Sequence, residues 1–354
     1  MNIIIDCRQL YASGVGVYLR GILPFFFQSA HYFFLLGDSE KLYPYASNEN
    51  AKIIPCDIKP FSLRELFFFP AKLKKIINNA DIYYSPFFNI PGGVKIPVFL
   101  TIHDIIFADI PALASRAGLK ARMWFFKRAY GKSSVIFTVS RFSKSRIERH
   151  LGGEKQIIVT YSAIQTIFLE YRKKIKNISK NKTIVFIGNI KKHKGLDCLL
   201  DAFTMARKEG LPHKLVIIGG ADNFRTADDK ISKAINSLGP EAVCFTGYLS
   251  DEKLLDYLAK ASLLVQPSLY EGFCLPPLEA MVLGTRALIS DIEVLREIYS
   301  DYPVSFFRAG DSVDLKNRMT DIINNNPSLP DLPDELLYKY TFEKTSKKIL
   351  EALR

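Results

Sequence analysis

The sequence predicts an α/β fold with two doubly wound parallel-sheet domains, and three observations support this prediction. The 354 residues are enough for two domains of roughly 150 to 200 residues each. Short, continuous apolar runs alternate with helix-like stretches, which is typical of parallel strands that are covered on both faces. The alternation stops at the polar, basic segment "YRKKIKNISKNK" and then starts again. We therefore expect an N-terminal domain (1–170), a linker (171–182), a C-terminal domain (183–335), and a last helix within 336–354 that can pack back on the first domain.

The first half contains seven predicted strands. They are the runs "NIIID", "YFFLLG", "KIIPC", "DIYYSP", "VFLTIHD", "SVIFTVS" and "IIVTY". Helices are expected after a glycine loop up to Phe27, and near 62–79, 113–131 and 141–151. The order of strand and helix predicts crossover connections within one parallel sheet.

The second half repeats this pattern. Strands are expected at "TIVFIGN", "KLVIIGG", "AVCFTG", "LLVQPS", "ALIS" and "VSFF". Helices are expected over 196–209, near 226–238 and 251–261, from residue 276, and in the amphipathic tail "YTFEKTSKKILEALR". Ligands of doubly wound sheets bind at the carboxyl ends of the strands. The loops "GNIKKHKG", "GGADN", "GYLSD" and "SLYEGF" are therefore expected to line one side of a cleft between the domains.

Composition favours a soluble globular protein. The chain is 48% hydrophobic and 24% charged, and no run reaches the about 18 apolar residues that span a membrane. It starts directly with a strand, without a signal-peptide pattern, so a cytoplasmic location is expected. The five cysteines and five histidines form no metal-ligand spacing. We expect the cysteines in the core, and neither a bound metal nor a resident cofactor.

Positive charge is concentrated in the first half. The net charge is +12, and residues 1–170 hold 21 Lys and Arg against 12 Asp and Glu. Such a face can attract nucleic acid, an anionic membrane or phosphorylated substrates. The segments "LRELFFFPAKLKKI" and "LKARMWFFKRAYGK" also combine aromatic with basic residues. They predict either helices at an anionic membrane surface or ordinary amphipathic helices with their aromatic side chains in the core.

The segment "SLYEGFCLPPLEA" places two carboxylates, Glu271 and Glu279, on either side of a short apolar turn. The Pro pair is suited to open a helix, so the segment reads as strand, loop and helix. In the first helical turn, Glu279 can accept both hydroxyl groups of a vicinal diol, while Glu271 faces a sugar. The alternatives are a helix-dipole partner for Glu279 and a solvated loop charge for Glu271.

The basic loop "GNIKKHKG" follows the first strand of the second domain. Its cationic side chains, Lys191, Lys192, His193 and Lys194, can stabilise the negative charge of a phosphate ligand. The alternative is a solvated basic face.

Two further motifs lie in the first domain. In "SGVGVYL", Gly14 and Gly16 allow close approach of the backbone to a ligand, although an ordinary tight turn explains them equally well. In "LTIHDIIF", His103 and Asp104 end a buried strand, where they can contact a ligand or serve a structural role.

Together these segments resemble the family-four retaining glycosyltransferases, which have the GT-B fold of two Rossmann-like domains facing a central cleft. The resemblance covers nearly the whole chain and is strongest in the E-x7-E segment around Glu271 and Glu279. It implies metal-independent, retaining transfer of a hexose from a GDP- or UDP-linked sugar donor. The acceptor is expected to be a saccharide, lipid-linked at the inner face of the cell membrane, in surface polysaccharide or glycan biosynthesis. Similarity of "GNIKKHKG" and "TIHD" to mannosyl-transferring members favours mannose.

The resemblance also assigns roles to residues. It implies that Glu279 binds the ribose, that Glu271 contacts the sugar ring, and that Lys194 binds the phosphates. The implied catalytic residues are His103, Lys194 and Glu271, and Asp104 and Arg141 lie on the acceptor side. The donor-binding set is Gly14, Gly16, Asn189, Lys194, Tyr248, Glu271, Gly272, Phe273, Cys274, Leu275 and Glu279. Asn189 stands where many members have arginine, and Lys191, Lys192 or His193 can supply this second cation instead.

Two other classes of function stay open. One is another GT-B enzyme, such as a nucleotide-sugar epimerase or a phosphorylase. The other is a non-catalytic basic binding protein, although the sequence has no recognised nucleic-acid motif and a nucleic-acid partner is not expected. The sequence therefore favours glycosyl transfer over both.

Overall fold

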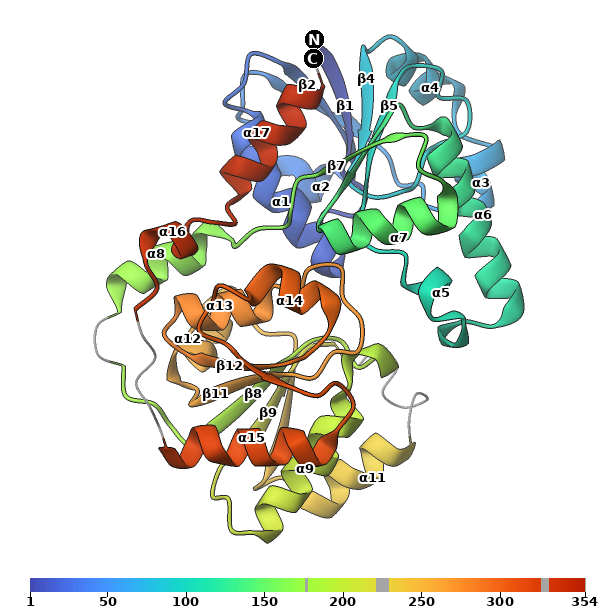
Figure 1. Cartoon of the computed structure of the whole chain (residues 1–354). Coiled ribbons are helices and arrows are strands. Elements are labelled where there is room, and N and C mark those ends of the chain that lie inside the picture. Colours follow the sequence, from blue (N-terminus) through green and yellow to red (C-terminus); the bar gives the residue numbers. More distant parts are fainter. Residues whose placement is uncertain (176–177, 221–228, 326–330, 354) are drawn as a thin grey trace. The chain divides into compact units, whose positions relative to one another are not determined.

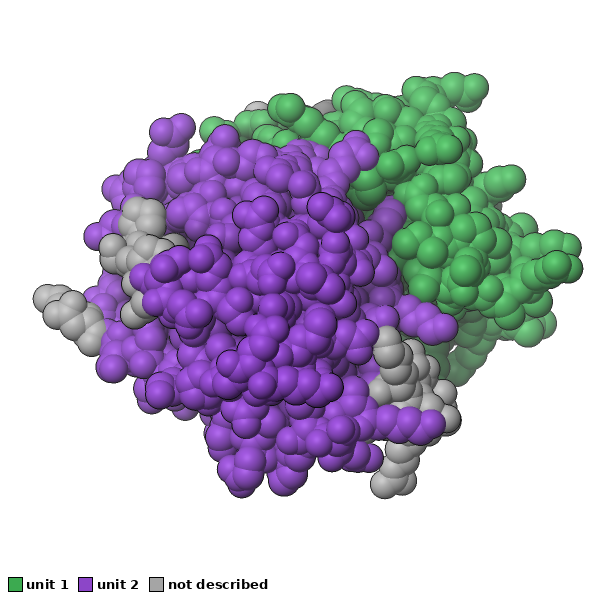
Figure 2. All heavy atoms as spheres, turned by 60° about the horizontal axis from the view of Figure 1, so that its bottom comes forward, with its two compact units in different colours: residues 1–165, 340–354 green, residues 166–339 purple. Residues whose placement is uncertain are grey.

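 The computed structural model describes residues 1–175, 178–220, 229–325 and 331–353. They form two compact units (Figures 1 and 2). Unit 1 comprises residues 1–165 and 340–354, and unit 2 comprises residues 166–339. Each unit contains one parallel sheet, of seven strands in unit 1 and six in unit 2, so the predicted α/β class with two parallel-sheet domains is confirmed.

The sheet of unit 1 has the strand order β3-β2-β1-β4-β5-β6-β7. All neighbouring strands are parallel, for example β1 with β2 and with β4. The chain reverses its direction of travel across the sheet between β1 and β4, so the loops after these two strands lie at the topological switch point. The strands are β1 Asn2–Asp6, β2 Tyr32–Gly37, β3 Ala51–Pro55, β4 Ile82–Ser85, β5 Val98–Ile102, β6 Val135–Thr138 and β7 Gln156–Val159.

Helices cover both faces of this sheet (Figure 1). Side-chain caps fix where several of them begin: the Ser140 hydroxyl accepts from the Ser143 N–H at 3.0 Å at the start of α7, which satisfies an amide that the helix leaves unpaired. The helical segments are α1 Ser13–Phe26, α2 Ser39–Leu42, η1 Tyr43–Tyr45, α3 Leu63–Phe67, α4 Ala71–Asn78, α5 Ile106–Asp109, η2 Pro111–Leu113, α6 Arg116–Lys132, α7 Arg141–Leu151 and α17 Phe342–Ala352.

The last helix, α17, belongs to unit 1 and packs on α1. A Cβ atom on Gly21 of α1 would lie 2.3 Å from the Phe342 ring, so only glycine leaves room for this ring. The Ser346 hydroxyl donates to the Ile22 carbonyl, and the Ile164 N–H donates to the Tyr340 carbonyl at 3.2 Å. Residues at the end of the chain therefore complete the fold that the first residues begin.

The sheet of unit 2 has the order β10-β9-β8-β11-β12-β13. Here the direction of travel reverses between β8 and β11, which places the loops after these strands at the switch point. The strands are β8 Thr183–Ile187, β9 Lys214–Ile218, β10 Val243–Gly247, β11 Leu263–Gln266, β12 Arg286–Ser290 and β13 Ser305–Phe307.

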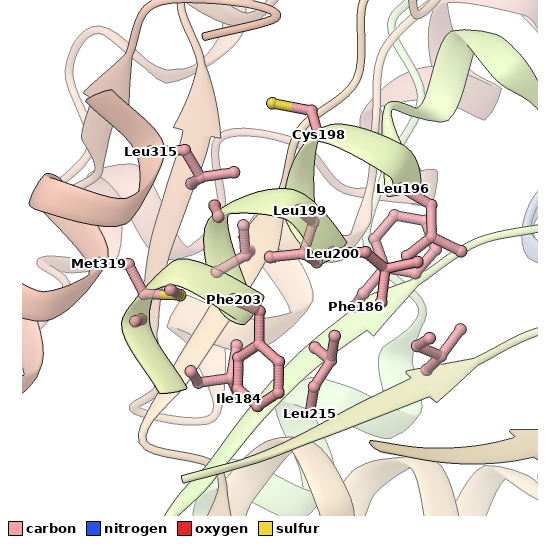
Figure 3. Packing of buried hydrophobic residues seen from close by; sticks show 14 of the residues in the cluster. Ile184, Phe186, Leu196, Cys198, Leu199, Leu200, Phe203, Leu215, Leu315 and Met319 are labelled. Atoms are coloured by element: carbon pink, nitrogen blue, oxygen red, sulfur yellow. The ribbon is translucent and has the colours of Figure 1, made fainter. Parts of the chain in front are cut away.

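The core of unit 2 lies where α9 and α15 cover this sheet. Figure 3 shows Leu199 and Phe203 of α9 among strand residues such as Ile184 and Leu215, with Met319 of α15 beside them. The apolar spacing along α9 supplies this buried face. The helical segments are α8 Thr166–Lys174, η3 Lys192–Lys194, α9 Leu196–Lys208, α11 Asp229–Leu238, α12 Asp251–Lys260, α13 Pro276–Val282, α14 Glu293–Tyr299, α15 Ser312–Asn325 and α16 Asp334–Leu337.

Three local predictions differ from the structure. The helix expected near 62–79 is two helices, α3 and α4, because Pro70 lacks an N–H and disfavours helical geometry before it. Residues 171–174 of the expected linker are the last turn of α8, and residues 176–177 lie outside the described part. Cys244 is exposed, unlike the other four cysteines. Within the described residues, no helix is both long and apolar enough to cross a bilayer.

Candidate functional site

Two loops of unit 2 meet at the switch point of its sheet. One follows β8 (188–195) and the other follows β11 (267–275). The Leu269 N–H donates to the His193 carbonyl at 2.7 Å. Gly195 has φ +67°, and a Cβ atom there would lie 2.0 Å from the Pro267 carbonyl oxygen. The two loops are thus held together by backbone contacts that only glycine at position 195 permits.

These contacts bring Lys194 and Glu271 together, 77 residues apart in sequence. The Lys194 Nζ lies 2.7 Å from Oε1 and 2.8 Å from Oε2 of Glu271. The Ser268 hydroxyl donates to the same carboxylate at 2.7 Å, and the Gln266 amide donates to Ser268 at 3.0 Å. The site therefore contains an ion pair whose carboxylate is also held by hydrogen bonds that run from Gln266 through Ser268.

The surroundings of Glu271 favour its ionised form. The Glu271 carboxylate is buried, and burial raises its pKa, but the ammonium group of Lys194 and the hydroxyl of Ser268 lower it more. The net result is a pKa below the ordinary value. Glu271 is consequently a carboxylate at neutral pH, placed to accept hydrogen bonds.

The turn between the two acidic residues is strained. Cys274 has φ +74°, which is uncommon for a residue with a side chain. The Tyr299 hydroxyl donates a short hydrogen bond to the Cys274 carbonyl and so holds this conformation. Phe273 is buried, Gly272 is half-buried, and Leu275 directly precedes α13. The turn therefore has a fixed shape on which Glu271 is presented.

Glu279 lies in the first turn of α13, as predicted, and it is 6% exposed. Burial, with a smaller contribution from the Asp251 carboxylate, raises its pKa to about 7. Within the described residues, no side chain forms a hydrogen bond or ion pair with its carboxyl group. A buried carboxyl group without such a partner is poised to accept hydrogen bonds from a ligand.

Asn189 and Tyr248 lie beside the same edge of the sheet. The Asn189 Oδ1 accepts from the Gly220 N–H at 3.3 Å and from the Tyr248 hydroxyl at 3.1 Å. Tyr248 is 65% exposed, so its ring is available to a ligand. The end of the predicted loop "GGADN" (221–223) lies outside the described residues. Burial, followed by the charge of Lys194, lowers the pKa of His193 to about 4, so His193 does not provide a second cation at neutral pH.

The other predicted residues belong to unit 1. His103 follows β5, and its Nε2 lies 2.9 Å from the Pro86 carbonyl oxygen. Burial lowers its pKa to about 4, so the ring is neutral and Nε2–H donates to that carbonyl. The Asp104 carboxylate accepts from the N–H of Ile106, the first residue of the short helix α5, at 3.1 Å. Arg141 is the exposed first residue of α7.

The prediction of a glycine loop after β1 is wrong, because Gly14 and Gly16 lie in the first turns of α1. A Cβ atom on Gly16 would lie 2.6 Å from the Leu10 carbonyl oxygen, whereas the space around Gly14 is open. Close packing of the helix start against the preceding turn therefore explains Gly16. Gly14 remains exposed at the beginning of the helix.

Sequence reasoning missed the groups that support the Lys194–Glu271 pair. Gln266 and Ser268 are polar residues at the end of an otherwise apolar strand, and this contrast was the available signal. Tyr299, which fixes the strained turn, gave no local signal because it lies 25 residues away. Across the described residues, no three His, Cys, Asp or Glu side chains are grouped so that they could hold a metal ion.

Comparison with known proteins identifies the family of this chain. The family model Glycosyltransferase Family 4 matches residues 12–167, and the model Glycosyl transferases group 1 matches residues 168–336. An uncharacterised glycosyltransferase of Methanocaldococcus jannaschii is 27% identical over 255 residues, which are 71% of this chain and 66% of that protein. The O-antigen chain mannosyltransferase B of Escherichia coli is 27% identical over 231 residues, 62% of this chain and 59% of that protein. The matches span less than two thirds of either relative.

Solved structures show the same fold. HepE of Anabaena, crystallised in complex with UDP-glucose, has a TM-score of 0.72 and 17% identity, with 100% of this chain and 99% of that chain covered. Sucrose-phosphate synthase from Thermosynechococcus elongatus has a TM-score of 0.68 and 15% identity, with 100% and 94% covered. Matched by both family models from residue 12 to residue 336, the chain belongs to the family-4, group 1 glycosyltransferases and has two domains of the GT-B class.

Proposed function

We propose that this chain is a metal-independent, retaining glycosyltransferase that transfers a hexose, mannose, from a nucleotide sugar to a saccharide acceptor. The acceptor is lipid-linked, at the cytoplasmic face of the membrane, in the synthesis of a surface polysaccharide. One observation carries the proposal: a partly buried Lys194–Glu271 ion pair at the switch point of unit 2, followed eight residues later by the carboxyl group of Glu279, which has no side-chain partner among the described residues. The name of the Escherichia coli relative supports mannose as the sugar.

In this proposal, Lys194 binds the diphosphate. Its ammonium group can exchange a bond to Glu271 for a bond to a phosphate oxygen, and α9 begins two residues later, at Leu196. The amino end of this 13-residue helix carries a partial positive charge and unpaired N–H groups, which favour an anion. Both groups stabilise the charge that develops on the leaving diphosphate, which is the role that a metal ion has in other transferases.

The two carboxylates bind hydroxyl groups. Glu271, held as a carboxylate, accepts from hydroxyls of the transferred sugar. Glu279 accepts from the two ribose hydroxyls, and these donors favour its ionised form and so lower its pKa on binding. Binding energy on the nucleotide then positions the sugar for transfer.

We assign the acceptor side to unit 1, where His103 and Asp104 follow β5 and Arg141 begins the helix after β6. Because the pKa of His103 is about 4, the imidazole acts as a neutral group that positions a hydroxyl. Arg141 offers a cation at the surface, which suits a phosphate between a saccharide and a lipid.

The test uses the purified chain with GDP-mannose, UDP-glucose and UDP-galactose as donors and a polyprenyl-diphosphate-linked saccharide as acceptor, with and without EDTA. We expect acceptor-dependent release of GDP from GDP-mannose, unchanged by EDTA, and a product with the anomeric configuration of the donor by NMR. An inverted product or EDTA sensitivity would contradict the mechanism. Conversion of the donor to an isomeric sugar without acceptor would identify an epimerase instead.

A further inference from the structure

Helix α3 buries its acidic side chain and exposes apolar ones, which is the reverse of the usual arrangement. Glu65 is completely buried, whereas Leu63, Phe67 and the following Phe68 are 70%, 64% and 74% exposed. Short helices on a protein surface normally bury the apolar side chains and expose the charged one. The exposed aromatic side chains of α3 therefore have no explanation in the packing of unit 1.

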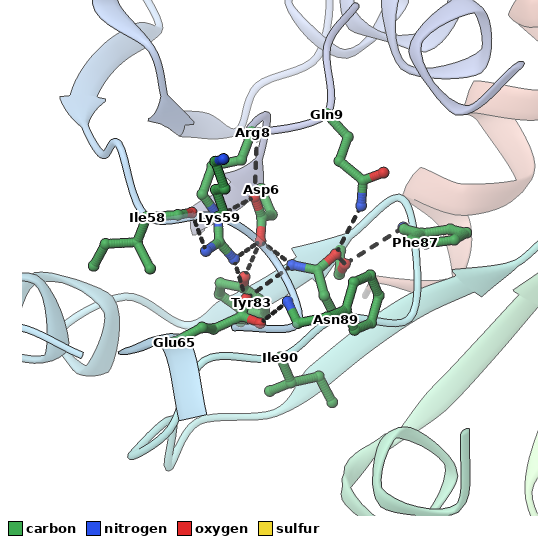
Figure 4. Close-up of polar contacts among 12 residues, drawn as sticks. Asp6, Arg8, Gln9, Ile58, Lys59, Glu65, Tyr83, Phe87, Asn89 and Ile90 are labelled. Atoms are coloured by element: carbon green, nitrogen blue, oxygen red, sulfur yellow. Dashed lines mark hydrogen bonds and ion pairs between the residues drawn. The ribbon is translucent and has the colours of Figure 1, made fainter. Parts of the chain in front are cut away.

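A polar network explains the inward direction of Glu65 (Figure 4). Its carboxylate accepts from the guanidinium of Arg8 at 2.6 Å, from the Phe61 N–H at 2.5 Å and from the Asn89 amide at 3.3 Å. Arg8 and Asn89 follow β1 and β4, the two strands at the switch point of this sheet. The network thus attaches α3 to the centre of unit 1 through a charged side chain.

These contacts of Glu65 oppose a rotation of α3 about its own axis. Arg8 also binds Asp6 and donates to the Ile58 carbonyl at 3.0 Å, so it is fully engaged in the network. If α3 rotated about its axis so that the aromatic side chains were buried, Glu65 would lose its partners. Arg8 would then keep only one of its two carboxylate partners, Asp6. Breaking a buried ion pair in this way is strongly unfavourable, because it leaves a buried charge without its partner. The exposed apolar side chains are therefore held outward.

Helix α6 extends the same surface. The Phe61 ring, just before α3, lies 5.1 Å from the Phe125 ring of α6, and Trp124 next to it is 49% exposed. Lys120 and Lys127 are exposed and lie four residues before and three residues after Trp124, which places them along one side of the helix.

The charge around these side chains is strongly positive. Residues 110–147, which include α6, contain no aspartate or glutamate, and α4 contributes the exposed Lys72 and Lys75. Arg64 of α3 lies 3.8 Å from the exposed Asp57, so the excess of positive charge comes from α4 and α6. The aromatic residues of these two segments divide into two groups: Phe69 and Phe126 are in the core, whereas Phe67, Phe68 and Trp124 are exposed.

We propose that Leu63, Phe67, Phe68 and Trp124, with Lys120 and Lys127 beside them, form a docking surface for an anionic lipid bilayer. Exposed aromatic and aliphatic side chains enter the boundary between headgroups and acyl chains, and lysines bind anionic headgroups. Charge argues against a second copy as the occupant, because two such basic surfaces would repel each other. Docking needs no donor or acceptor, so it stands apart from the proposed transfer reaction.

Trp124 is the only tryptophan of the chain, so its fluorescence reports directly on this surface. The full chain is titrated with vesicles of phosphatidylglycerol and phosphatidylcholine, and with vesicles of phosphatidylcholine alone, at 0.05 to 0.5 M NaCl. We expect a blue shift of the emission and sedimentation with the anionic vesicles, both of which decrease with salt because the charge attraction is screened. Brominated lipids should quench the emission.

Variants identify the residues that carry binding. F67S/F68S should lower the partition coefficient for anionic vesicles about tenfold or more, and K120Q/K127Q should lower it about fivefold per charge. Y43S is the matched control, because Tyr43 is an aromatic residue of unit 1 that is 76% exposed and lies outside this surface. Circular dichroism checks that all variants remain folded, which exposed positions should permit.

Several results would overturn the proposal. One is equal binding to neutral and anionic vesicles, and another is an unchanged emission spectrum on addition of either. Loss of binding in Y43S as large as in F67S/F68S would show that the surface is not specific. If F67S/F68S instead converted a dimer to a monomer without any effect on vesicles, a second copy would be the occupant. Donor turnover, measured separately, tests the proposed function whatever the vesicles show.

Discussion

Replacing Glu279 by glutamine should make the protein more stable at alkaline pH and weaken its binding of nucleotides. Glu279 is 6% exposed, and burial raises its pKa to about 7. Above pH 7, Glu279 is therefore a desolvated carboxylate in the folded chain, whereas the same carboxylate is hydrated in the unfolded chain. Glutamine has nearly the same shape and carries no charge, so E279Q removes this penalty.

The magnitude follows from the two pKa values. The difference between the ordinary 4.5 and about 7, at about 1.36 kcal/mol per pKa unit, corresponds to about 3.4 kcal/mol. A raised carboxyl pKa means that the folded chain binds more protons between pH 4.5 and 7, so this group lowers stability as pH rises through that range. About 2.5 kcal/mol of the change falls between pH 5 and pH 8.5. E279Q should therefore exceed the wild type at pH 8.5 by about 3 kcal/mol and by much less at pH 5.

Thermal unfolding at both pH values measures this difference, which amounts to about 2–4 °C per kcal/mol for a domain of this size. E271Q is the matched control with the opposite sign. The pKa of Glu271 is lowered by Lys194 against the effect of burial, so this carboxylate stabilises the fold above its ordinary pKa and E271Q should melt earlier at pH 8.5. Equal melting of E279Q and wild type at pH 8.5, or an E279Q advantage that stays the same at pH 5, would refute the reasoning. Calorimetry with GDP should show weaker binding to E279Q.

Three other predictions concern the site and its support. K194A should lower kcat about 100- to 1,000-fold, as expected on loss of one charge-stabilising donor, while K192A at an exposed neighbouring position should have a much smaller effect; near-wild-type turnover of K194A would remove its role. Gly284 has φ +74° and open space around it, so G284A should lower the free energy of unfolding by about 1–2 kcal/mol. G195A should lower it distinctly more, because its Cβ would lie 2.0 Å from a carbonyl oxygen. Equal melting temperatures of the two variants would contradict this prediction. The imidazole NMR signals of His103 should stay constant from pH 5.5 to 8 because its pKa is about 4, and a midpoint near 6.5 would show that the ring is not desolvated.

The alternation of strands and helices was predictable because parallel strands buried on both faces have continuous apolar sequences. The position of Glu279 in the first turn of a helix was predictable as well, since two prolines mark that start. These are local signals, and they need no knowledge of which strands are neighbours.

Features that depend on the order of strands could not be predicted in the same way. Lys194 and Glu271 form an ion pair because β8 and β11 are adjacent, and no sequence spacing announces this. Glu65 is buried because it forms an ion pair with Arg8, which follows β1. The sequence of α3 alone does not indicate this pair, so it could not predict that the apolar side chains of α3 are exposed. Tertiary contacts decided both cases against the local pattern.

The packing of α17 on α1 has a consequence for how the protein is made. Residues 166–339 are continuous and enclose one complete core, whereas residues 1–165 need the Phe342 ring and the rest of α17 to cover α1. During synthesis from the amino end, all residues of unit 2 are therefore made before the last residues of unit 1. Until residues 340–354 emerge, the surface of α1 around Gly21 stays uncovered, so a chain that ends before α17 would expose this apolar surface while unit 2 has all of its residues.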